Sequence, residues 1–480
     1  KEFSNGYKIC ENLAKVAGGS KKIKCFTEYD SSLDTDPCII CLGILQNSKL
    51  TTFVDKIVEE INTENYDCDT ISLTLTIPTV IIIRERAVFI YLSKIDALNK
   101  NVCYNKAKVQ NIKDVWKWYL SFYIQLLTKK SMESSNIVSP LTVDVFISYP
   151  QDQEECQELL NNYTKLLTKE SFMKRKEEKY ITKKNIETIT NSITDEQFEQ
   201  CFTIPPKKPG HFINIDKLVC KHSSIFIGGR YTKFSRRLCQ TPWFVHGKWK
   251  MENSVQDLIC KCILDFTKSK STKFLSSGRE DVDVRMLFHG RPFVIELIDP
   301  RITKINKDDL LYLKQKINEN TKKIRMMSDL KIVAKKDLKQ LKEGEYSKSK
   351  TYRALCICKK VVNSSCLLKK LRNIKNLKII QNTPIRVLHR RALFPRERII
   401  FELRARFAFF EEIKNYQKDV KYISDDYSFI ILDFKAQAGT YVKEFVHGDF
   451  GRTVPNLCYL LDTEIDIIAL DVTNISLEWP

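Results

Sequence analysis

The sequence predicts an α+β protein with two domains. Its 480 residues, 43% of them hydrophobic, are enough for a sizeable core and favour two domains over one. Strand-like alternation, as in residues 70–77, and helix-like stretches, as in residues 254–266, where Ser254 and Asp257 are spaced like a capping pair, both occur along the chain. The composition shifts near Ile225, so we expect an accessory domain over residues 1–224 and a second domain over residues 225–480.

The charge balance is strongly basic. Lys and Arg number 79 and Asp and Glu number 59, which gives a net charge of +20. Such an excess suits a polyanion, most simply a nucleic acid. No uninterrupted apolar run is long enough to cross a bilayer, so we expect no membrane partner.

The 16 cysteines are abundant but scattered, which is typical of a reduced, intracellular protein. Nuclear and cytoplasmic locations both fit this pattern. The chain begins at Lys1 without a methionine or a signal-peptide pattern, so we expect the native start to be missing. Cys38 and Cys41 form the best-spaced pair, but they supply only two of the four ligands of a tetrahedral zinc. Cys10 and Cys25 upstream do not form a second close pair.

The first domain shows helix, strand and linker signals in turn. The aromatic residues within 115–127 recur at helical spacing, which favours a helix with one buried face. The expected elements are a helix at 51–61, a strand at 70–77, a helix at 115–127, a strand at 142–148, a solvated, mixed-charge helix face at 169–184 and a linker at 205–210.

The second domain opens with a strand that runs into a Gly-Gly turn and a basic-aromatic tail, at residues 225–237. Arg230 and Tyr231 belong to this tail, which suits RNA because cations meet phosphates while rings stack on bases. A surface turn whose rings pack inward explains the same residues equally well. The further elements expected are helices at 254–266, 307–320 and 328–342, strands at 292–298, 350–358, 377–381, 384–389, 398–409 and 427–434, a short helix at 441–446, and final strand pairs at 465–479.

The densest charge cluster lies in residues 276–285, which read Ser-Ser-Gly-Arg-Glu-Asp-Val-Asp-Val-Arg. This acidic loop lies between a helix-like and a strand-like stretch, and catalytic carboxylates are often presented in that way. Glu280, Asp281 and Asp283 are therefore all candidate nucleophiles. A solvated turn with a local ion pair, for example to Arg279, is the competing interpretation.

Several segments of the second domain match one family pattern. They are the acidic loop with residues 290–296, the stretch Gly-Arg-Tyr-x-Lys-Phe-Ser-Arg at 229–236, the stretch Arg-Val-Leu-His-Arg-Arg at 386–391, and residues 437–457. These segments resemble the Pus-ten family of archaeal and eukaryotic tRNA pseudouridine synthases. The resemblance spans residues 223–480 strongly and the amino-terminal part weakly.

The resemblance implies that Asp281, in an Arg-x-Asp turn, is the nucleophile. It makes Tyr352 the active-site tyrosine beside the uracil ring, and Lys443 the basic partner that keeps the aspartate ionised. By their positions alone, Tyr352 also fits a core tyrosine at a strand end and Lys443 an exposed helix lysine. The residues expected to face substrate or RNA are Tyr441, Arg279, Arg230, Arg386, His389, Arg390 and Leu460.

The cysteine pair is similar to the second half of the zinc site of this family. Cys38 and Cys41 are therefore the candidate ligands of a structural zinc, whose site is incomplete here because the family's first Cys-x-x-Cys has no counterpart. No cofactor is expected for catalysis.

The resemblance also implies a fold and a reaction. The fold is a THUMP-like RNA-binding domain followed by a pseudouridine synthase domain, with a large mixed, mainly antiparallel sheet and a central cleft. The implied reaction converts uridine to pseudouridine in the TΨC arm of tRNA, at positions 54 and 55, by a monomer whose partner is tRNA and, further, other structured RNA.

Two other functions are alternatives. An RNA-binding scaffold in small-RNA processing would have little or no catalysis. Another THUMP-linked enzyme, such as a methyltransferase or a thiouridine synthase, would need a glycine-rich cofactor or nucleotide loop, and the sequence shows none.

Overall fold

The computed structural model describes residues 36–98, 110–132, 139–166, 181–341, 349–359, 368–369, 371–414 and 427–480. The chain divides into two compact units, Lys1–Ser223 and Ser224–Pro480. Each unit has its own hydrophobic core.

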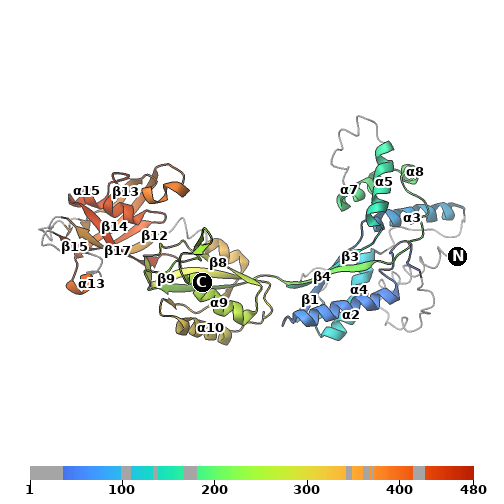
Figure 1. The fold of residues 1–480 in the computed structure, drawn as a ribbon, viewed down its shortest axis with the longest axis horizontal. Helices are drawn as coiled ribbons and strands as arrows, with labels where there is room; N and C mark the ends of the chain where they lie inside the picture. Colours follow the sequence, from blue (N-terminus) through green and yellow to red (C-terminus); the bar gives the residue numbers. More distant parts are fainter. Residues whose placement is uncertain are drawn as a thin grey trace. The chain divides into compact units, whose positions relative to one another are not determined.

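Within the described residues, the first unit holds a four-stranded sheet in the order β2-β1-β3-β4 (Figure 1). β3 pairs with β1 in parallel and with β4 in antiparallel register. The strands are β1 (Thr70–Thr76), β2 (Ser131–Met132), β3 (Leu141–Ser148) and β4 (Asn214–His222). The helices are α2 (Asn47–Glu64), α3 (Val80–Leu98), α4 (Ile112–Thr128), α5 (Asp152–Leu166), α7 (Lys183–Ser192) and α8 (Asp195–Cys201).

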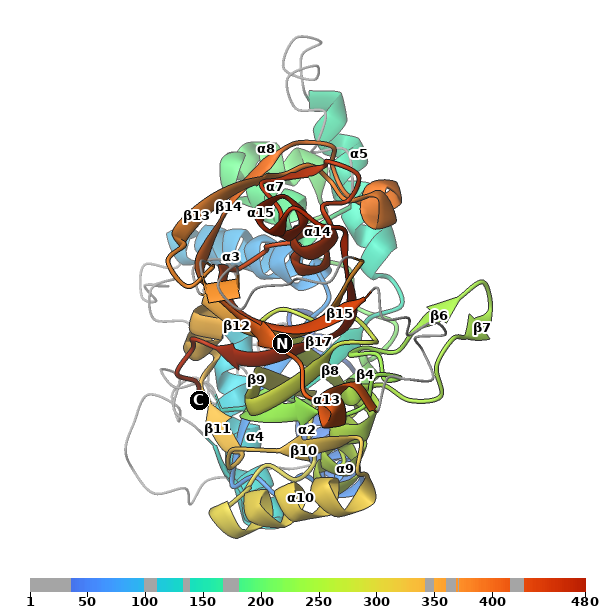
Figure 2. The ribbon, with the colours of Figure 1, turned by 90° about the vertical axis from the view of Figure 1, so that its left-hand side faces the viewer.

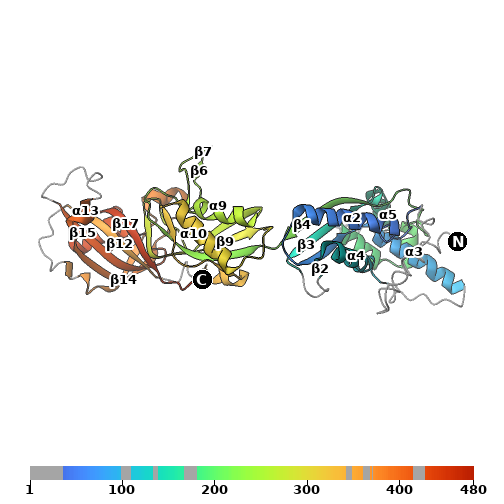
Figure 3. The same ribbon diagram turned by 90° about the horizontal axis from the view of Figure 1, so that it is seen from below.

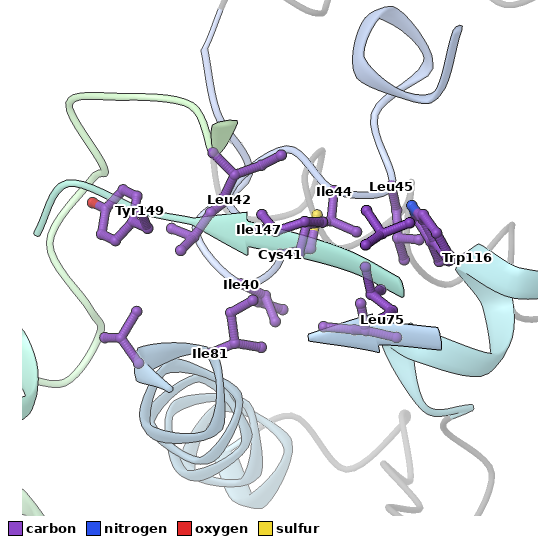
Figure 4. Close-up of a cluster of buried hydrophobic side chains, with 14 of the residues drawn as sticks. Ile40, Cys41, Leu42, Ile44, Leu45, Leu75, Ile81, Trp116, Ile147 and Tyr149 are labelled. Carbon is purple, nitrogen blue, oxygen red and sulfur yellow. The ribbon is translucent and has the colours of Figure 1, made fainter. Parts of the chain in front are cut away.

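The core of the first unit forms where alternate residues of the strands pack against a tight turn at residues 39–45. Every second residue of β3 is buried, as the period of a strand with one packed face requires. Figure 4 shows Ile147 of β3 and Leu75 of β1 facing Cys41 and Ile44 of the turn, with Trp116 of α4 beside them. α2 and α4 lie alongside the sheet, whereas α3, α5, α7 and α8 gather at one end of it (Figure 1).

The predicted elements of the first unit are confirmed where the structure describes them, with one change of detail. Trp116 and Tyr119 of α4 are buried, but Trp118 and Phe122 are exposed, so the aromatic run covers more than the core face. The linker expected at 205–210 joins α8 to β4 inside the unit. Most of the helix expected at 169–184 lies outside the described residues.

Among the described residues, the second unit is built on an eleven-stranded sheet whose main path is β10-β5-β9-β17-β12-β15-β14-β13-β16. Its pairs are antiparallel except for β9 with β17, which run in parallel over two residue pairs. The strands of this sheet are β5 (Ile225–Lys233), β8 (Ser271–Ser276), β9 (Arg285–Ile298), β10 (Ile324–Met326), β11 (Lys331–Val333), β12 (Ser349–Cys358), β13 (Lys375–Gln381), β14 (Arg396–Phe407), β15 (Ser428–Gln437), β16 (Thr453–Val454) and β17 (Ile465–Ile475).

The helices of the second unit cover two different parts of this sheet (Figure 2). α9 (Val255–Thr267) packs beside β8 and α10 (Lys307–Asn320) beside β10, whereas α14 (Val442–His447) packs beside β16 and β17 with α15 (Leu457–Leu461) next to it. Two separate apolar clusters lie under these helix pairs. A small hairpin, β6 (Phe244–Val245) with β7 (Lys248–Trp249), extends away from the sheet, as Figures 2 and 3 show, and a short α13 (Phe410–Lys414) follows β14.

Local signals predicted α9 correctly. Ser254 accepts a hydrogen bond from the backbone N–H of Asp257, and the carboxylate of Asp257 accepts one from the N–H of Ser254, which is the capping box that the sequence indicates.

Three element predictions for the second unit are wrong. Residues 328–342 are not one helix, because β11 and the 3₁₀ turn η4 (Lys335–Asp337) divide them. Residues 384–389 are not a strand but the 3₁₀ helix η5 (Ile385–Arg390), which follows Pro384. The final strand pairs expected at 465–479 are the single strand β17. β8 was not predicted from the sequence, and its antiparallel pairing with β9 means that the acidic loop joins two strands.

The expected Gly-Gly turn is also wrong, because Gly228 and Gly229 lie inside β5. A Cβ atom on Gly229 would lie 2.9 Å from Leu330 and 3.1 Å from the ring of Phe293. The absence of a side chain therefore lets the core close over the strand.

No helix within the described ranges combines the length and apolarity that a membrane span needs.

We predict that Gly229→Ala lowers the free energy of unfolding of the second unit by about 1–3 kcal/mol, because the added methyl overpacks Leu330 and Phe293. Urea unfolding measures this change. Gly210→Ala is the control, because no atom lies within 4 Å of its new Cβ, and it should change stability by less than about 0.5 kcal/mol. Equal stabilities of the two variants would contradict the packing described here.

Candidate active site

The acidic loop connects β8 to β9 through a sharp turn. Gly278 has φ +79°, a left-handed conformation that favours glycine, and a Cβ atom there would lie 2.8 Å from Lys350 Nζ. Ser276 Oγ donates to Gly278 O over 2.8 Å, which closes the turn. The chain then places Glu280 inward and leaves Asp281 and Asp283 accessible to solvent.

Glu280 is a buried structural acid. Arg291 Nε donates to Glu280 Oε2 over 2.6 Å, and Tyr231 Oη donates to Glu280 Oε1 over 2.9 Å. Gln240 donates to Tyr231 Oη, and Arg291 also donates to Ser277 O. Both oxygens of this carboxylate are therefore occupied by partners inside the protein.

The backbone of the acidic loop is held from below by two cations. The Lys233 ammonium is 0% exposed and donates to Asp281 O over 3.1 Å and to Val282 O over 3.0 Å. Arg236 donates to Asp283 O over 2.9 Å and to the Asp471 carboxylate of β17. Three consecutive carbonyls are thus fixed, which limits the positions that the acidic side chains can take.

Two further cations meet the acidic side chains. Lys443 Nζ lies 2.7 Å and 3.0 Å from the two oxygens of Asp283 and 3.7 Å from Asp281 Oδ2. Arg386 Nη1 donates to Asp281 Oδ2 over 3.2 Å. Lys443 is therefore nearer to Asp283 than to the aspartate that the resemblance assigned to it.

The pKa values in this region follow burial and pairing. Partial burial raises the pKa of Asp283, but the hydrogen bond and charge of Lys443 outweigh this effect and lower the pKa below its ordinary value. Burial lowers the pKa of Lys233 to about 8, against the opposing charges of Glu280 and Asp283.

Tyr352 lies on β12, two strands from the acidic loop. It pairs with Val472 of β17, which in turn pairs with Met286 of β9. Its ring stacks on Phe434 at 5.2 Å, and burial raises its pKa to about 12. The phenol therefore keeps its proton at neutral pH.

The other residues expected to face substrate differ in their surroundings. Arg279, His389 and Arg390 are exposed, and Leu460 is half-buried against the core. The backbone of Tyr441 exchanges two hydrogen bonds with the Gln381 side chain.

Arg230 is not brought to the acidic loop. Its guanidinium donates to the carbonyls of His289, Gly290, Leu477 and Trp479. These bonds join β5 to the end of the chain and give the side chain a structural role.

The described residues do not supply the further ligands that the expected zinc ion needs. Cys38 and Cys41 are buried in the apolar core of the first unit (Figure 4), and the ranges that the structure describes hold no group of three or more His, Cys, Asp or Glu residues arranged to bind a metal ion. Two thiols do not fit a tetrahedral zinc. Cys10 and Cys25 lie outside the described residues.

Several residues of this site were not predicted from the sequence, among them Lys233, Arg236, Glu444 and Asp471. Lys233 and Arg236 were counted only as cations for RNA, because nothing local shows that they reach a loop nearly 50 residues away. Glu444 follows Lys443 directly in the matched motif, and that adjacency was the available signal.

Comparison with known proteins places this chain in an isomerase class. A family model described as "Pus10, C-terminal" matches residues 226–476, and one described as "Eukaryotic Pus10, N-terminal" matches residues 38–220. The chain therefore belongs to the Pus10 family, the Pus-ten family that its motifs resemble.

Individual relatives agree with this assignment. A human protein named tRNA pseudouridine synthase Pus10 is 34% identical over 444 residues, which are 92% of this chain and 79% of the relative. The protein of that name from Xenopus laevis is 34% identical over 445 residues, 92% of this chain and 81% of the relative. The one from Thermofilum pendens is 36% identical over 252 residues, 52% of each chain.

Solved structures show only a weak likeness. One chain from a crystal structure of a Cbf5-Nop10-Gar1 complex is 13% identical, with 51% of this chain and 48% of that chain covered and a TM-score of 0.25.

We predict that Glu280→Gln lowers the free energy of unfolding by about 3–5 kcal/mol, because Arg291 then remains charged and buried without a carboxylate. Chemical unfolding measures the loss. Glu412→Gln removes the partly exposed pair with Arg406 and should cost no more than about 1 kcal/mol. A stable Glu280→Gln protein without activity would instead give Glu280 a chemical role.

Lys233 should make stability depend on pH in the alkaline range. Between pH about 8 and 10.5 the unfolded lysine binds a proton and the native one does not, so the free energy of unfolding rises with pH. Across this pH window, the free energy of unfolding of the wild type should rise by on the order of 3 kcal/mol relative to that of Lys233→Met. Urea unfolding at several pH values tests this, and a flat difference would show an ordinary lysine.

Proposed function

We propose that this chain is a tRNA pseudouridine synthase that converts uridine to pseudouridine in the TΨC arm, at positions 54 and 55, with Asp281 as the nucleophile. Membership of the Pus10 family supports the reaction class, because the matched relatives are named tRNA pseudouridine synthases. The arm and the two positions come from the resemblance of the motifs.

One observation carries the choice of Asp281. Glu280 has both oxygens engaged by Arg291 and Tyr231, and both oxygens of Asp283 are hydrogen-bonded to Lys443. Both cations near Asp281 approach its Oδ2, and no residue in the described ranges bonds to its Oδ1. Asp281 therefore has an oxygen that is open to a substrate, and its side chain is 43% exposed.

The reaction needs little beyond this carboxylate. Asp281 attacks the nucleoside, at the uracil ring or at the ribose carbon, and the bond between N1 and C1′ breaks. The uracil turns over, C5 bonds to C1′, the bond between the aspartate and the nucleoside breaks to restore the carboxylate, C5 loses its proton and N1 gains one. Atoms and electrons balance without an oxidant or a cofactor.

The neighbouring groups have distinct parts in this proposal. Lys443 and Arg386 supply positive charge that favours the ionised form of a carboxylate. Tyr352, which keeps its proton, offers a ring against the uracil rather than an anionic base. The target base must leave the stack to reach this site, and a central cleft in the sheet would receive it.

The first unit would hold the rest of the tRNA. A THUMP-like RNA-binding role for it is consistent with the net charge of +20 of the whole chain. Exposed cations on η5, including His389 when protonated and Arg390, would meet phosphates near the target.

We predict that Asp281→Asn abolishes pseudouridine formation in an unmodified tRNA transcript while tRNA binding persists, because the amide is no nucleophile. Mapping of pseudouridine in the T-loop, with a filter-binding assay alongside, measures both. Asp283→Asn is the matched control and should keep most of the activity.

The alternative outcomes have clear meanings. Wild-type binding without modification would favour the RNA-binding scaffold. Activity that survives in Asp281→Asn but not in Asp283→Asn would move the nucleophile to Asp283.

A further inference from the structure

The matched motif around α14 contains a buried acid, Glu444, next to Lys443, the lysine that contacts the acidic loop. Glu444 is 2% exposed, and Arg386 Nε donates to its Oε1 over 2.6 Å. The other oxygen, Oε2, is buried and has no hydrogen-bond partner among the residues described. A carboxylate in that setting depends strongly on the one cation that reaches it.

The same guanidinium also reaches the acidic loop. Arg386 uses Nε for Glu444 and Nη1 for Asp281 Oδ2. A guanidinium is planar and rigid, so fixing Nε also fixes the direction in which Nη1 points. A lysine at this position has one nitrogen and could not impose that direction.

The segment that carries Arg386 is tied to α14 and the turn after it. Ile385 N–H donates to Asp449 Oδ2 over 3.2 Å. Four residues before Ile385, the Gln381 side chain exchanges two hydrogen bonds with the backbone of Tyr441, the N-cap of α14. The segment that carries Arg386 is therefore hydrogen-bonded to residues before and after Glu444.

We propose that Glu444 is a positioning residue that, through Arg386, holds Asp281 by Oδ2 and so presents Oδ1 to the target nucleotide. The inference rests on the proposed function. In this inference Arg386 orients the nucleophile Asp281, a role in addition to the phosphate contact that its basic motif predicts.

Burial explains why this contact persists when RNA arrives. If Arg386 moved to a phosphate, Glu444 would stay behind as a buried carboxylate without a cation. An exposed arginine paired with an exposed acid faces no such penalty. Arg386 and Asp281 are 41% and 43% exposed, so a nucleotide can approach this pair without displacing the buried end.

The test compares Glu444→Gln, Arg386→Lys and the double variant in pseudouridine formation on a tRNA transcript. Each single variant should lower kcat about 10-fold or more, with KM for tRNA within about 2-fold. The double variant should be no worse than the worse single variant, because both changes break one linkage. Glu412→Gln, which breaks the Arg406 pair elsewhere in the unit, should leave kcat and KM unchanged.

Other results would overturn the inference. A higher KM with unchanged kcat in Arg386→Lys would make Arg386 a phosphate contact only. Loss of kcat in Glu444→Gln that only follows the unfolded fraction of the protein would make Glu444 merely structural. An inactive wild type would reject the proposed function itself, whereas an active wild type with additive variants would reject only the positioning role.

Discussion

The acidic loop depends on the buried ion pair between Glu280 and Arg291. Two charges inside a protein are tolerable only when their remaining hydrogen bonds are satisfied, and Tyr231, Gln240 and the Ser277 carbonyl supply those bonds. With Glu280 locked inward, the next residue of an extended turn faces outward. The position of the exposed Asp281 thus follows from the neighbouring Glu280, whose two oxygens are bonded inside the protein.

The cations around this loop make two kinds of contact. Lys233 and Arg236 bind main-chain carbonyls from the protein side, whereas Lys443 and Arg386 meet carboxylates from the open side. The first pair holds the backbone still, and the second pair sets the charge at the surface where RNA would lie. A net charge of +20 therefore includes lysines and arginines that never meet a polyanion.

The predictions from sequence succeeded where the signal was local. The capping box of Ser254 and Asp257 and the apolar spacing of α10 lie within one helix each, and both helices are where the pattern puts them. The apolar alternation after Pro384 is compatible with both a strand and a 3₁₀ helix. A strand was predicted there, and the structure has a 3₁₀ helix. The three candidate nucleophiles lie together in the acidic loop, but only contacts with other segments distinguish the buried Glu280 from the exposed Asp281. The link from Glu444 through Arg386 spans 58 residues, so no local pattern could show it.

The short parallel pairing of β9 with β17 has a consequence for the timing of folding. Arg285, at the end of the acidic loop, binds the carboxylate of Asp471, which lies 186 residues later in the chain. Contacts of such long range form only after the intervening chain is available. During synthesis on the ribosome, the loop therefore cannot make this contact, or reach the shape described here, before residue 471 has emerged.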